Sequence, residues 1–335
     1  MKGVAAIILA AGKGTRMKSN KAKVVFPIAG KSLINRVIDT TLKAGANMIS
    51  VVVGYKKETV KEIIPDNPKI RFAEQKEQLG TGHAVMVAEE NFRNFDGSIL
   101  VLAGDVPFLK PDTLKKVIDK NQSTNATCTI LTAIIDDAGK YGRIVRDHQS
   151  NISKIVEFKD ANEKERKIKE FNTGIYCFSA RELFASLKKI DNNNKQKEYY
   201  LTDVLEIIRK DRKKINSIVI SDVDEVTGVN SKKQLAYLEN KIYDKIKDLW
   251  MEKGVRLENP DSIIIGEDVV LEKDVKIAAN TILKGKTIIG ENSEIGPFSY
   301  LNNAIIGKNV TLKGYNLVEN SKVDENEKLD YNVNL

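Results

Sequence analysis

The last third of the chain repeats an aliphatic residue at every sixth position. The repeated residues are Ile265, Leu271, Ile277, Leu283, Ile289, Ile295 and Leu301, and after a one-residue slip Ile306 and Leu312. Small or β-branched residues precede them by two positions, at Ile263, Val269, Val275, Thr281, Thr287, Ser293 and Ser299. A six-residue period predicts a left-handed parallel β-helix of about three coils, because three repeats make one triangular coil that buries its aliphatic residues against the next. We expect this short β-helix at residues 255–320, with a polar tail at 321–335.

The N-terminus begins with a continuously apolar run, residues 4–9, which leads into a small-residue turn at residues 10–14. Such a run suits a central parallel strand that is covered on both faces. The turn therefore leaves the carboxyl end of a strand, where glycines allow backbone N–H groups to approach phosphate oxygens. The spacing matches neither G-x-G-x-x-G nor the P-loop pattern, and the cations Arg16 and Lys23 follow. These residues predict a triphosphate site.

Strands and helices alternate through the first two-thirds of the chain. Residues 33–42 carry a helical apolar stripe, and residues 48–53 and 98–103 are further core strands. This order predicts an α/β fold with a doubly wound, mostly parallel sheet in residues 1–230. From about residue 127 the pattern changes to short alternating strands, which predicts an antiparallel excursion over the mouth of the sheet. Residues 231–254 read as an amphipathic linker helix.

Composition excludes several classes of protein. The chain has 335 residues and a formal charge of +8, but its lysines are dispersed among acidic residues without a basic block, which argues against nucleic-acid binding. The two cysteines have no metal-ligand or secreted-scaffold spacing, and no apolar stretch approaches the length of a membrane span. We therefore expect a cytoplasmic protein without a membrane partner. So short a β-helix predicts self-association, for which a trimer is the usual arrangement of hexapeptide helices.

Motifs along the first two-thirds of the chain carry a family resemblance. The string L-A-A-G-K-G-T-R-M at residues 9–17, followed by K-V-V-F-P-I-A-G-K at 23–31, resembles the signature of sugar-1-phosphate nucleotidyltransferases. Further motifs follow in order: E-Q-L-G-T-G-H-A (77–84), G-D-V-P (104–107), Y-G-R-I (141–144), I-V-E-F-K-D-A (155–161), F-N-T-G-I (171–175), E-Y-Y-L-T-D (198–203) and G-V-N (228–230). Together they look like the bacterial N-acetylglucosamine-1-phosphate uridyltransferases.

The resemblance implies a set of site residues. Arg16 and Lys23 would be catalytic, with Arg16 and Lys13 neutralising the β- and γ-phosphates and Lys23 reaching the α-phosphate and the sugar phosphate. The nucleotide would be held by Leu9, Ala10, Ala11, Gly12, Lys13, Gln75, Gly80, Thr81 and Gly104. The sugar would be held by Gly142, Glu157, Asn172 and Thr173. We interpret His83 as structural, because no carboxylate in sequence reach makes it a base.

A metal site is predicted beside the first loop. Asp105 follows the apolar strand at 98–103 and a glycine, so its carboxylate should emerge at the same sheet edge as residues 10–14. A carboxylate there can hold Mg²⁺, which prefers few protein oxygens. A strand-end aspartate can also be a simple turn former, and the resemblance favours the metal role, with Asn230 as the second ligand.

The predicted function is synthesis of UDP-N-acetylglucosamine and pyrophosphate from UTP and N-acetylglucosamine 1-phosphate. Related uridyltransferases commonly carry a longer β-helix with an acetyltransferase site, and we expect that second activity to be absent here. Two alternatives stay open. One is a nucleotidyltransferase for another hexose 1-phosphate, such as glucose 1-phosphate with UTP or dTTP, and the other is a catalytically silent sugar-nucleotide sensor.

Overall fold

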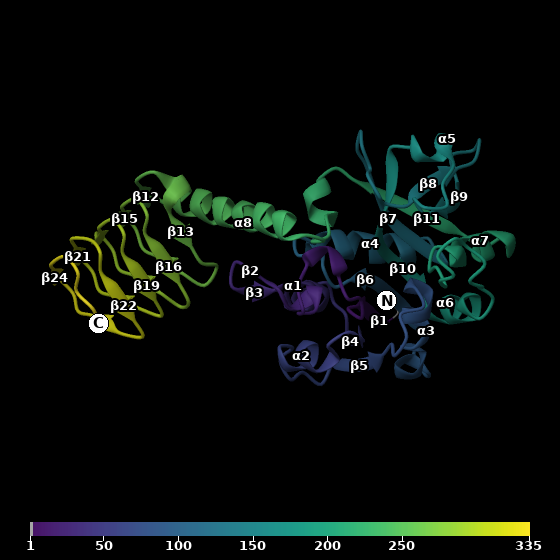
Figure 1. Cartoon of the computed structure of the whole chain (residues 1–335), viewed down its shortest axis with the longest axis horizontal. Helices are drawn as coiled ribbons and strands as arrows, with labels where there is room; N and C mark the ends of the chain where they lie inside the picture. The colour runs from purple at the N-terminus through teal and green to yellow at the C-terminus, as the bar shows by residue number, and fades with distance from the viewer. Residues whose placement is uncertain (1–2) are drawn as a thin grey trace. The chain divides into compact units, whose positions relative to one another are not determined.

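The computed structural model describes residues 3–335, which form two compact units (Figure 1). Unit 1 contains the described residues up to Phe26 and Ser32–Lys232, and unit 2 contains Pro27–Lys31 and Lys233–Leu335. Within residues 3–335, no helix combines the length and the apolar character that a bilayer crossing requires.

Unit 1 is built on a sheet with the strand order β11-β7-β10-β6-β1-β4-β5. Its strands are β1 (Gly3–Leu9), β4 (Met48–Val53), β5 (Ile70–Glu74), β6 (Gly97–Ala103), β7 (Cys128–Ile134), β10 (Glu170–Ser179) and β11 (Ile215–Ile220). Strands β5, β4, β1 and β6 run parallel, as do β7 and β11, whereas β10 is antiparallel to both of its neighbours. The predicted mostly parallel sheet is confirmed.

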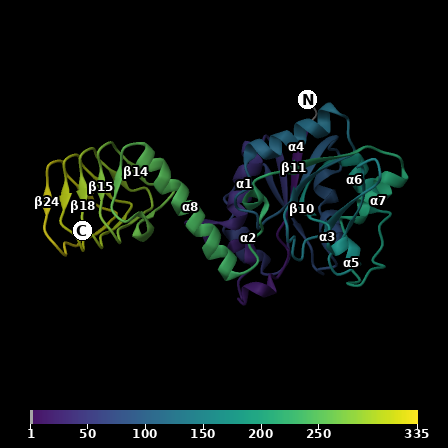
Figure 2. The ribbon, with the colours of Figure 1, turned by 90° about the horizontal axis from the view of Figure 1, so that it is seen from above.

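Helices cover both faces of this sheet (Figure 2). One face is covered by α1 (Leu33–Lys43), α2 (Lys57–Glu62) and α4 (Pro111–Ser123), and the other by α3 (Thr81–Met86), α6 (Ala180–Leu187) and α7 (Asp203–Lys210). Successive residues of β1 alternate between the two cores: Ala6 and Ile8 face the first, and Ala5 and Ile7 face the second. A strand buried on both faces has no polar alternation, which is why the run at its start reads as continuously apolar.

A hairpin of β8 (Arg143–Arg146) and β9 (Ile152–Val156) leaves the main sheet. It pairs with β10 only where Arg143 lies opposite Phe171. The short helix α5 (Glu163–Arg166) follows, with a capping box between Asn162 and Glu165. The hairpin is the predicted antiparallel excursion.

Register explains why the two candidate phosphate and metal loops meet. Along the parallel pair β1 and β6, Leu9 lies opposite Ala103, so both strands end at the same level. The Gly104 N–H then donates to the Leu9 carbonyl at 3.0 Å. The turn after β1 and Asp105 after β6 consequently leave the sheet side by side.

Unit 2 contains a parallel β-helix and nearly all of α8 (Lys232–Glu252), whose first residue belongs to unit 1. Ile246 and Trp250 of α8 pack on the β-helix core. The coil strands are β12 (Arg256–Leu257), β13 (Ile264–Ile265), β14 (Val270–Leu271), β15 (Lys276–Ile277), β16 (Ile282–Lys284), β17 (Ile288–Ile289), β18 (Glu294–Ile295), β19 (Tyr300–Asn302), β20 (Ile305–Ile306), β21 (Thr311–Leu312), β22 (Leu317–Glu319), β23 (Lys322–Val323) and β24 (Lys328–Leu329). The short strands β2 (Pro27–Ile28) and β3 (Lys31–Ser32) pair with each other.

The coil strands form three parallel sheets of five, four and four strands, and the left-handed β-helix is confirmed. It is longer than predicted, because β23 and β24 lie in the segment that the sequence assigns to a polar tail, residues 321–335. The six-residue period continues there after a second one-residue slip, with Val318 and Val323 buried. Asn320 and Asn326 have φ of +51° and +65°, the left-handed conformation that asparagine tolerates better than most residues. The polar composition of this segment thus belongs to the turns between strands.

Candidate active site

The turn after β1 is shaped for close approach of the backbone. Gly14 has φ +65°, and a Cβ at this position would lie 2.6 Å from the Cβ of Lys23. A side chain would therefore clash and strain the backbone, so only glycine lets the turn pack against Lys23. A Cβ on Gly12, in contrast, would meet no atom within 4 Å, so this part of the turn faces open space. The 3₁₀ turn Thr15–Met17 follows and carries Arg16.

Four predicted phosphate and metal residues converge on one point. The Arg16 Nη2 donates to Asn230 Oδ1 at 2.8 Å, and the Lys23 Nζ donates to the same oxygen at 3.0 Å. Lys23 also forms an ion pair with Asp105 Oδ2. Residues separated by up to 214 positions in the chain thus share one polar cluster, which we call the cation cluster: Arg16, Lys23, Asp105 and Asn230.

Backbone contacts hold the two oxygen donors of the cation cluster together. The Val229 N–H donates to the Asp105 carbonyl at 2.9 Å, which ties residues 228–230 to the end of β6. A Cβ on Gly228 would lie 3.1 Å from Asp105 Oδ2. Asp105 is itself only 8% exposed, so its carboxylate has little freedom to move away.

The oxygens of Asp105 and Asn230 fit a divalent cation. Both accept a hydrogen bond from the Lys23 ammonium, so one cationic group already lies between them. Within residues 3–335, no cluster of three or more His, Cys, Asp or Glu side chains could hold a metal. One carboxylate and one amide make a sparse, hard-oxygen donor set, which suits an ion whose remaining ligands are phosphate oxygens or water.

The predicted base-binding residues form a second group. Gln75 is 3% exposed, and its Nε2 lies 3.0 Å from the Gly80 carbonyl and 3.2 Å from His83 Nδ1. His83 therefore orients Gln75, which agrees with its interpretation as structural. The Thr81 hydroxyl accepts from the Leu201 N–H at 3.1 Å. A Cβ on Gly80 would lie 2.5 Å from the Tyr199 carbonyl, so this turn packs tightly on the segment around residue 200.

The Lys13 ammonium contacts an aromatic ring. Its Nζ lies over the Tyr55 ring, 5.5 Å from the ring centroid. The other predicted nucleotide residues of the turn, Ala10 and Ala11, are buried and bonded to the neighbouring strand end: the Ala10 N–H donates to the Val52 carbonyl, and the Tyr55 N–H donates to the Ala11 carbonyl.

The predicted sugar residues come from two parts of unit 1. Gly142 precedes β8 and Glu157 follows β9, so both lie at the base of the hairpin, whereas Asn172 belongs to β10. The Asn172 N–H donates to the Gly142 carbonyl at 2.9 Å. A Cβ on Gly142 would lie 3.5 Å from Glu157 Oε1, so the absence of a side chain leaves space beside that carboxylate.

The hydroxyl of Thr173, which the resemblance assigns to the sugar, makes hydrogen bonds within the sheet. It donates to the Leu131 carbonyl at 2.6 Å, and the Ile175 N–H lies 3.3 Å from it. The register between β10 and β7 shifts between Asn172 and Ile175, which marks a β-bulge. The Thr173 side chain thus holds the bulge that follows Asn172.

Tyr141 is a site residue that the motif reading passed over. Its ring packs on Phe171 with centroids 4.7 Å apart. Burial raises the pKa of its hydroxyl, while a backbone hydrogen bond from Gly228 opposes the rise, and the charges of Asp105 and Arg16 also act on it. Tyr141 therefore lies between the cation cluster and the sugar residues. In the sequence, the signal that could have identified it is its place beside Gly142 in the Y-G-R-I motif.

Carboxyl groups beside the sugar residues have raised pKa values. Burial, and then the negative charges of Asp160 and Asp203, raise the pKa of Glu157. Burial, together with Glu206, Asp191 and Asp160, raises the pKa of Asp203 to about 6 from 3.8. The charged forms of these groups are therefore disfavoured in the folded protein.

Asp203→Asn should become progressively more stable than the wild type as the pH rises from about 4 to 7. Below 3.8 Asp203 is protonated in both the folded and the unfolded chain, and above about 6 the folded protein must hold an unfavourable carboxylate. Thermal unfolding across this range measures the difference in Tm. Asp211→Asn is the control, since a hydrogen bond from Lys189 lowers the pKa of Asp211 below 3.8: its difference in Tm from the wild type should stay nearly constant above about pH 4 and change only at lower pH. A constant difference in Tm for Asp203→Asn would contradict the assignment.

Comparison with known proteins agrees with this geometry. The nucleotidyl transferase family matches residues 5–251. The "Bifunctional protein GlmU" of Caldanaerobacter subterraneus subsp. tengcongensis is 44% identical over 329 residues, which are 98% of this chain and 71% of that protein. The GlmU of Enterococcus faecalis is 42% identical over 320 residues, covering 96% of this chain and 69% of its own length.

A structural comparison supports the same fold. The crystal structure of a UDP-glucose pyrophosphorylase complexed with UDP-glucose aligns with a TM-score of 0.59 and 20% identity, over 73% of this chain and all of that chain. At this identity the likeness shows the fold alone. The relatives above 40% identity align along nearly the whole chain, and they establish its family as well as its fold. The chain belongs to the nucleotidyl transferase family, among the GlmU proteins, and is a nucleotidyltransferase of the UDP-N-acetylglucosamine pyrophosphorylase type.

Proposed function

We propose that the cation cluster catalyses uridylyl transfer from UTP to N-acetylglucosamine 1-phosphate. The observation that carries this proposal is the convergence of Arg16, Lys23 and Asp105 on one point beside the turn after β1, through Asn230. A guanidinium, an ammonium and a metal-binding carboxylate at the edge of a phosphate-binding turn are what a triphosphate requires.

The chemical step is a displacement at phosphorus. A phosphate oxygen of the sugar phosphate bonds to the α-phosphorus of UTP, the bond from that phosphorus to the bridging oxygen breaks, and pyrophosphate leaves with the electron pair. Because the attacking oxygen is already an anion, no general base is needed, and positioning and charge stabilisation supply the catalysis. We assign Lys23 to the α-phosphate and the sugar phosphate, and Arg16 to the departing phosphates.

We propose Mg²⁺ as the divalent ion held by Asp105 and Asn230. When bound, it would neutralise charge on the phosphates of the nucleotide. The chain's contribution is to fix the two oxygens: the bond from Val229 to the Asp105 carbonyl and the close approach of Gly228 hold them in register. The Lys23 ammonium would give up its present contacts to these oxygens and remain within reach of the phosphates.

The remaining residues are assigned to the base and the sugar. Gln75, held by His83, and the backbone at Gly80 would pair with the uracil edge, and the turn from Leu9 to Lys13 together with Gly104 would line the ribose and phosphates. The Glu157 carboxylate would accept hydrogen bonds from sugar hydroxyls, and the Asn172 side chain would bridge a hydroxyl and the amide of the N-acetyl group. Gly142 would leave room for the N-acetyl group. Thr81 and Thr173 would contribute through their backbone, since their hydroxyls already accept from Leu201 and donate to Leu131.

A pyrophosphate-release assay tests this function. The panel pairs UTP, dTTP, CTP and GTP with N-acetylglucosamine 1-phosphate, glucosamine 1-phosphate and glucose 1-phosphate, with and without Mg²⁺. We expect the highest kcat/KM for UTP with N-acetylglucosamine 1-phosphate. Adding acetyl-CoA to the glucosamine 1-phosphate reaction measures acetyl transfer separately. A preference for glucose 1-phosphate, or no release with any pair, would contradict the proposal.

We further propose that the chain forms a homotrimer through the β-helix. On the sheet β14-β17-β20-β23, the outward-facing residues Val270, Ile288 and Ile305 lie in register on successive coils. They are 47%, 39% and 46% exposed, so they form a continuous apolar column on the surface of unit 2. The equivalent column on another sheet, with Lys276, Glu294 and neighbours, is charged. Burial of the apolar column against other copies would remove it from water.

Ile288→Lys should convert the trimer into monomers, because it would place an unpaired ammonium in the centre of the apolar column. Light scattering coupled to size-exclusion chromatography measures the mass. Thr311→Lys, which adds the same charge on the sheet that carries Glu294, should leave the mass unchanged. A monomeric wild type, or a trimeric Ile288→Lys, would contradict this assembly.

A cytoplasmic location is consistent with the two thiols. Cys128 and Cys177 are free and buried, and burial raises the pKa of both. Such thiols persist unpaired in a reducing compartment.

A further inference from the structure

The sugar residues lie on two bodies that share few backbone contacts. Gly142 and Glu157 flank the β8–β9 hairpin at its base, and Asn172 belongs to β10 of the main sheet. Between these strands the register contains a single pair, Arg143 with Phe171, besides the bond from the Asn172 N–H to the Gly142 carbonyl. The distance between the two halves of the sugar site therefore depends on what else ties the hairpin to the sheet.

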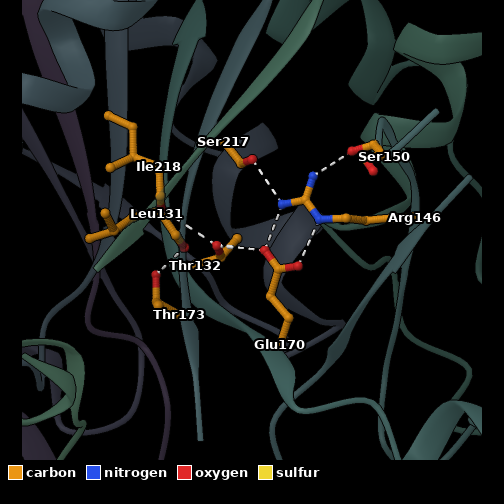
Figure 3. Close-up of polar contacts among 8 residues, drawn as sticks. All are labelled: Leu131, Thr132, Arg146, Ser150, Glu170, Thr173, Ser217 and Ile218. Carbon is orange, nitrogen blue, oxygen red and sulfur yellow. Dashed lines mark hydrogen bonds and ion pairs between the residues drawn. The ribbon is translucent and has the colours of Figure 1, made fainter. Parts of the chain in front are cut away.

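Three isoleucines of the hairpin pack in the core of the sheet, and Arg209 of α7 also bonds to the hairpin. Among these ties, the side chain of Arg146 spans directly from β8 to β10 (Figure 3). Arg146, the last residue of β8, forms a bidentate ion pair with Glu170, the first residue of β10: its Nε donates to Oε2 at 2.7 Å and its Nη2 donates to Oε1 at 2.6 Å. The same Nη2 donates to Ser217 Oγ on β11 at 2.9 Å, and the Nη1 donates to the Ser150 carbonyl in the turn of the hairpin at 2.8 Å.

The carboxylate of Glu170 is also tied to the strand behind the sugar site. The Thr132 hydroxyl on β7 donates to Glu170 Oε1 at 2.8 Å. Thr132 is fully buried and lies directly opposite Asn172 in the register of β7 and β10. The next residue of β7 towards its start, Leu131, accepts from the Thr173 hydroxyl that holds the bulge. The Arg146–Glu170 pair is thus bonded to the part of β7 that also holds the bulge beside Asn172.

Geometry and burial make this pair stronger than an ordinary surface ion pair. The side chains of Arg146 and Glu170 are 28% and 12% exposed. A planar guanidinium that makes two parallel bonds to a carboxylate fixes direction as well as distance, and its other donors are used as well. Most other ion pairs of unit 1 join exposed lysines to surface carboxylates, such as Lys189 with Asp211, whose side chains are 55% and 35% exposed.

We infer that Arg146 and Glu170 are positioning residues that set the sugar site, by holding the hairpin with Gly142 and Glu157 at a fixed distance from Asn172. The inference rests on the proposed function, in which these three residues hold the sugar. The UTP residues lie on other loops, after β1, β5 and β6. Loss of the pair should therefore weaken the sugar phosphate and spare UTP.

Arg146→Met tests the inference by removing the guanidinium and keeping a side chain of similar length. We expect the KM for the sugar phosphate to rise about tenfold while the KM for UTP stays within about twofold, because a displacement of less than about 1 Å already weakens oriented contacts. Glu170→Gln, which removes the charge but keeps an acceptor, should raise the same KM by a smaller factor. The KM of Arg146→Lys for the sugar phosphate should lie between those of the wild type and Arg146→Met, because lysine keeps the charge without the bidentate geometry.

Lys189→Met is the matched control, since it removes an ion pair of unit 1 that does not contact the hairpin strands. It should leave both KM values unchanged. A lower Tm for Arg146→Met with both KM values unchanged would show a merely structural pair and overturn the inference. An equal rise in both KM values would overturn it as well.

Hydrogen exchange separates this inference from the proposed function. The KM values are measured with whichever hexose 1-phosphate and nucleotide the wild type uses fastest, so a different substrate preference refutes the proposed function alone. Independently of activity, the Asn172 N–H, which donates to Gly142, should exchange faster in Arg146→Met than in Lys189→Met. Equal exchange in the two variants would overturn the positioning role.

Discussion

Asp105→Asn should lower kcat by at least about 100-fold, because a bound divalent ion supplies several kcal/mol of transition-state stabilisation and each 1.4 kcal/mol is about tenfold. The amide can still accept a hydrogen bond from Lys23, and the backbone bond from Val229 to residue 105 is unaffected, so the fold should persist. Steady-state pyrophosphate release measured at increasing Mg²⁺ is the test. The Mg²⁺ concentration for half-maximal activity should rise along with the loss of kcat.

Asp112→Asn is the control for this substitution. Asp112 lies in the first turn of α4, where it forms an exposed ion pair with Lys115. It should change neither kcat nor the dependence on Mg²⁺. Near-normal turnover of Asp105→Asn at low Mg²⁺ would show that the metal binds elsewhere.

Lys23→Ala should lower kcat by about 100- to 1,000-fold, the usual cost of removing one charge-stabilising group from a preorganised site. Its ammonium lies between Asp105 and Asn230, and its Cβ packs against Gly14 of the phosphate-binding turn, so it is held where negative charge moves during the transfer. The KM for UTP should change less than kcat, because the contact strengthens in the transition state. Single-turnover kinetics with saturating UTP measure this loss directly.

The neighbouring Lys21 provides the control for Lys23. It is exposed and carries the same charge two residues earlier on the same loop. Lys21→Ala should retain wild-type kcat at physiological salt, since a solvated charge at this distance acts only weakly on the phosphates. A similar loss in both variants would mean that the general positive potential of the loop, and not the placement of Lys23, supports turnover.

Much of the fold was readable because the relevant signals are local. The apolar run of β1 identifies a strand buried on both faces, and the six-residue period identifies the β-helix without knowledge of any contact. Where the local signal weakened, the structure differs from the expectation. Residues 321–335 read as a polar tail because polar residues there follow a second slip in the period, although Val323 is as buried as the earlier repeats.

The candidate site was readable only in part. The resemblance named Arg16, Lys23, Asp105 and Asn230, and the structure brings them together. It could not show that Lys13 lies over Tyr55, because a flexible side chain selects its partner from neighbours in space. The resemblance also could not show that Tyr141 lies between the cation cluster and the sugar residues, since the neighbours of Tyr141 come from distant segments.

The sequence and the tertiary structure determined different features of this protein. The chain itself determined which strands are buried, where the phosphate-binding turn leaves its strand and how the coils repeat, because each depends on residues within a few positions of one another. Tertiary structure alone decided that Arg146 and Glu170 tie the β8–β9 hairpin to β10, and that Thr173 holds a bulge. Such bonds depend on strand register and on the meeting of segments far apart in the chain, which periodicity and composition do not encode.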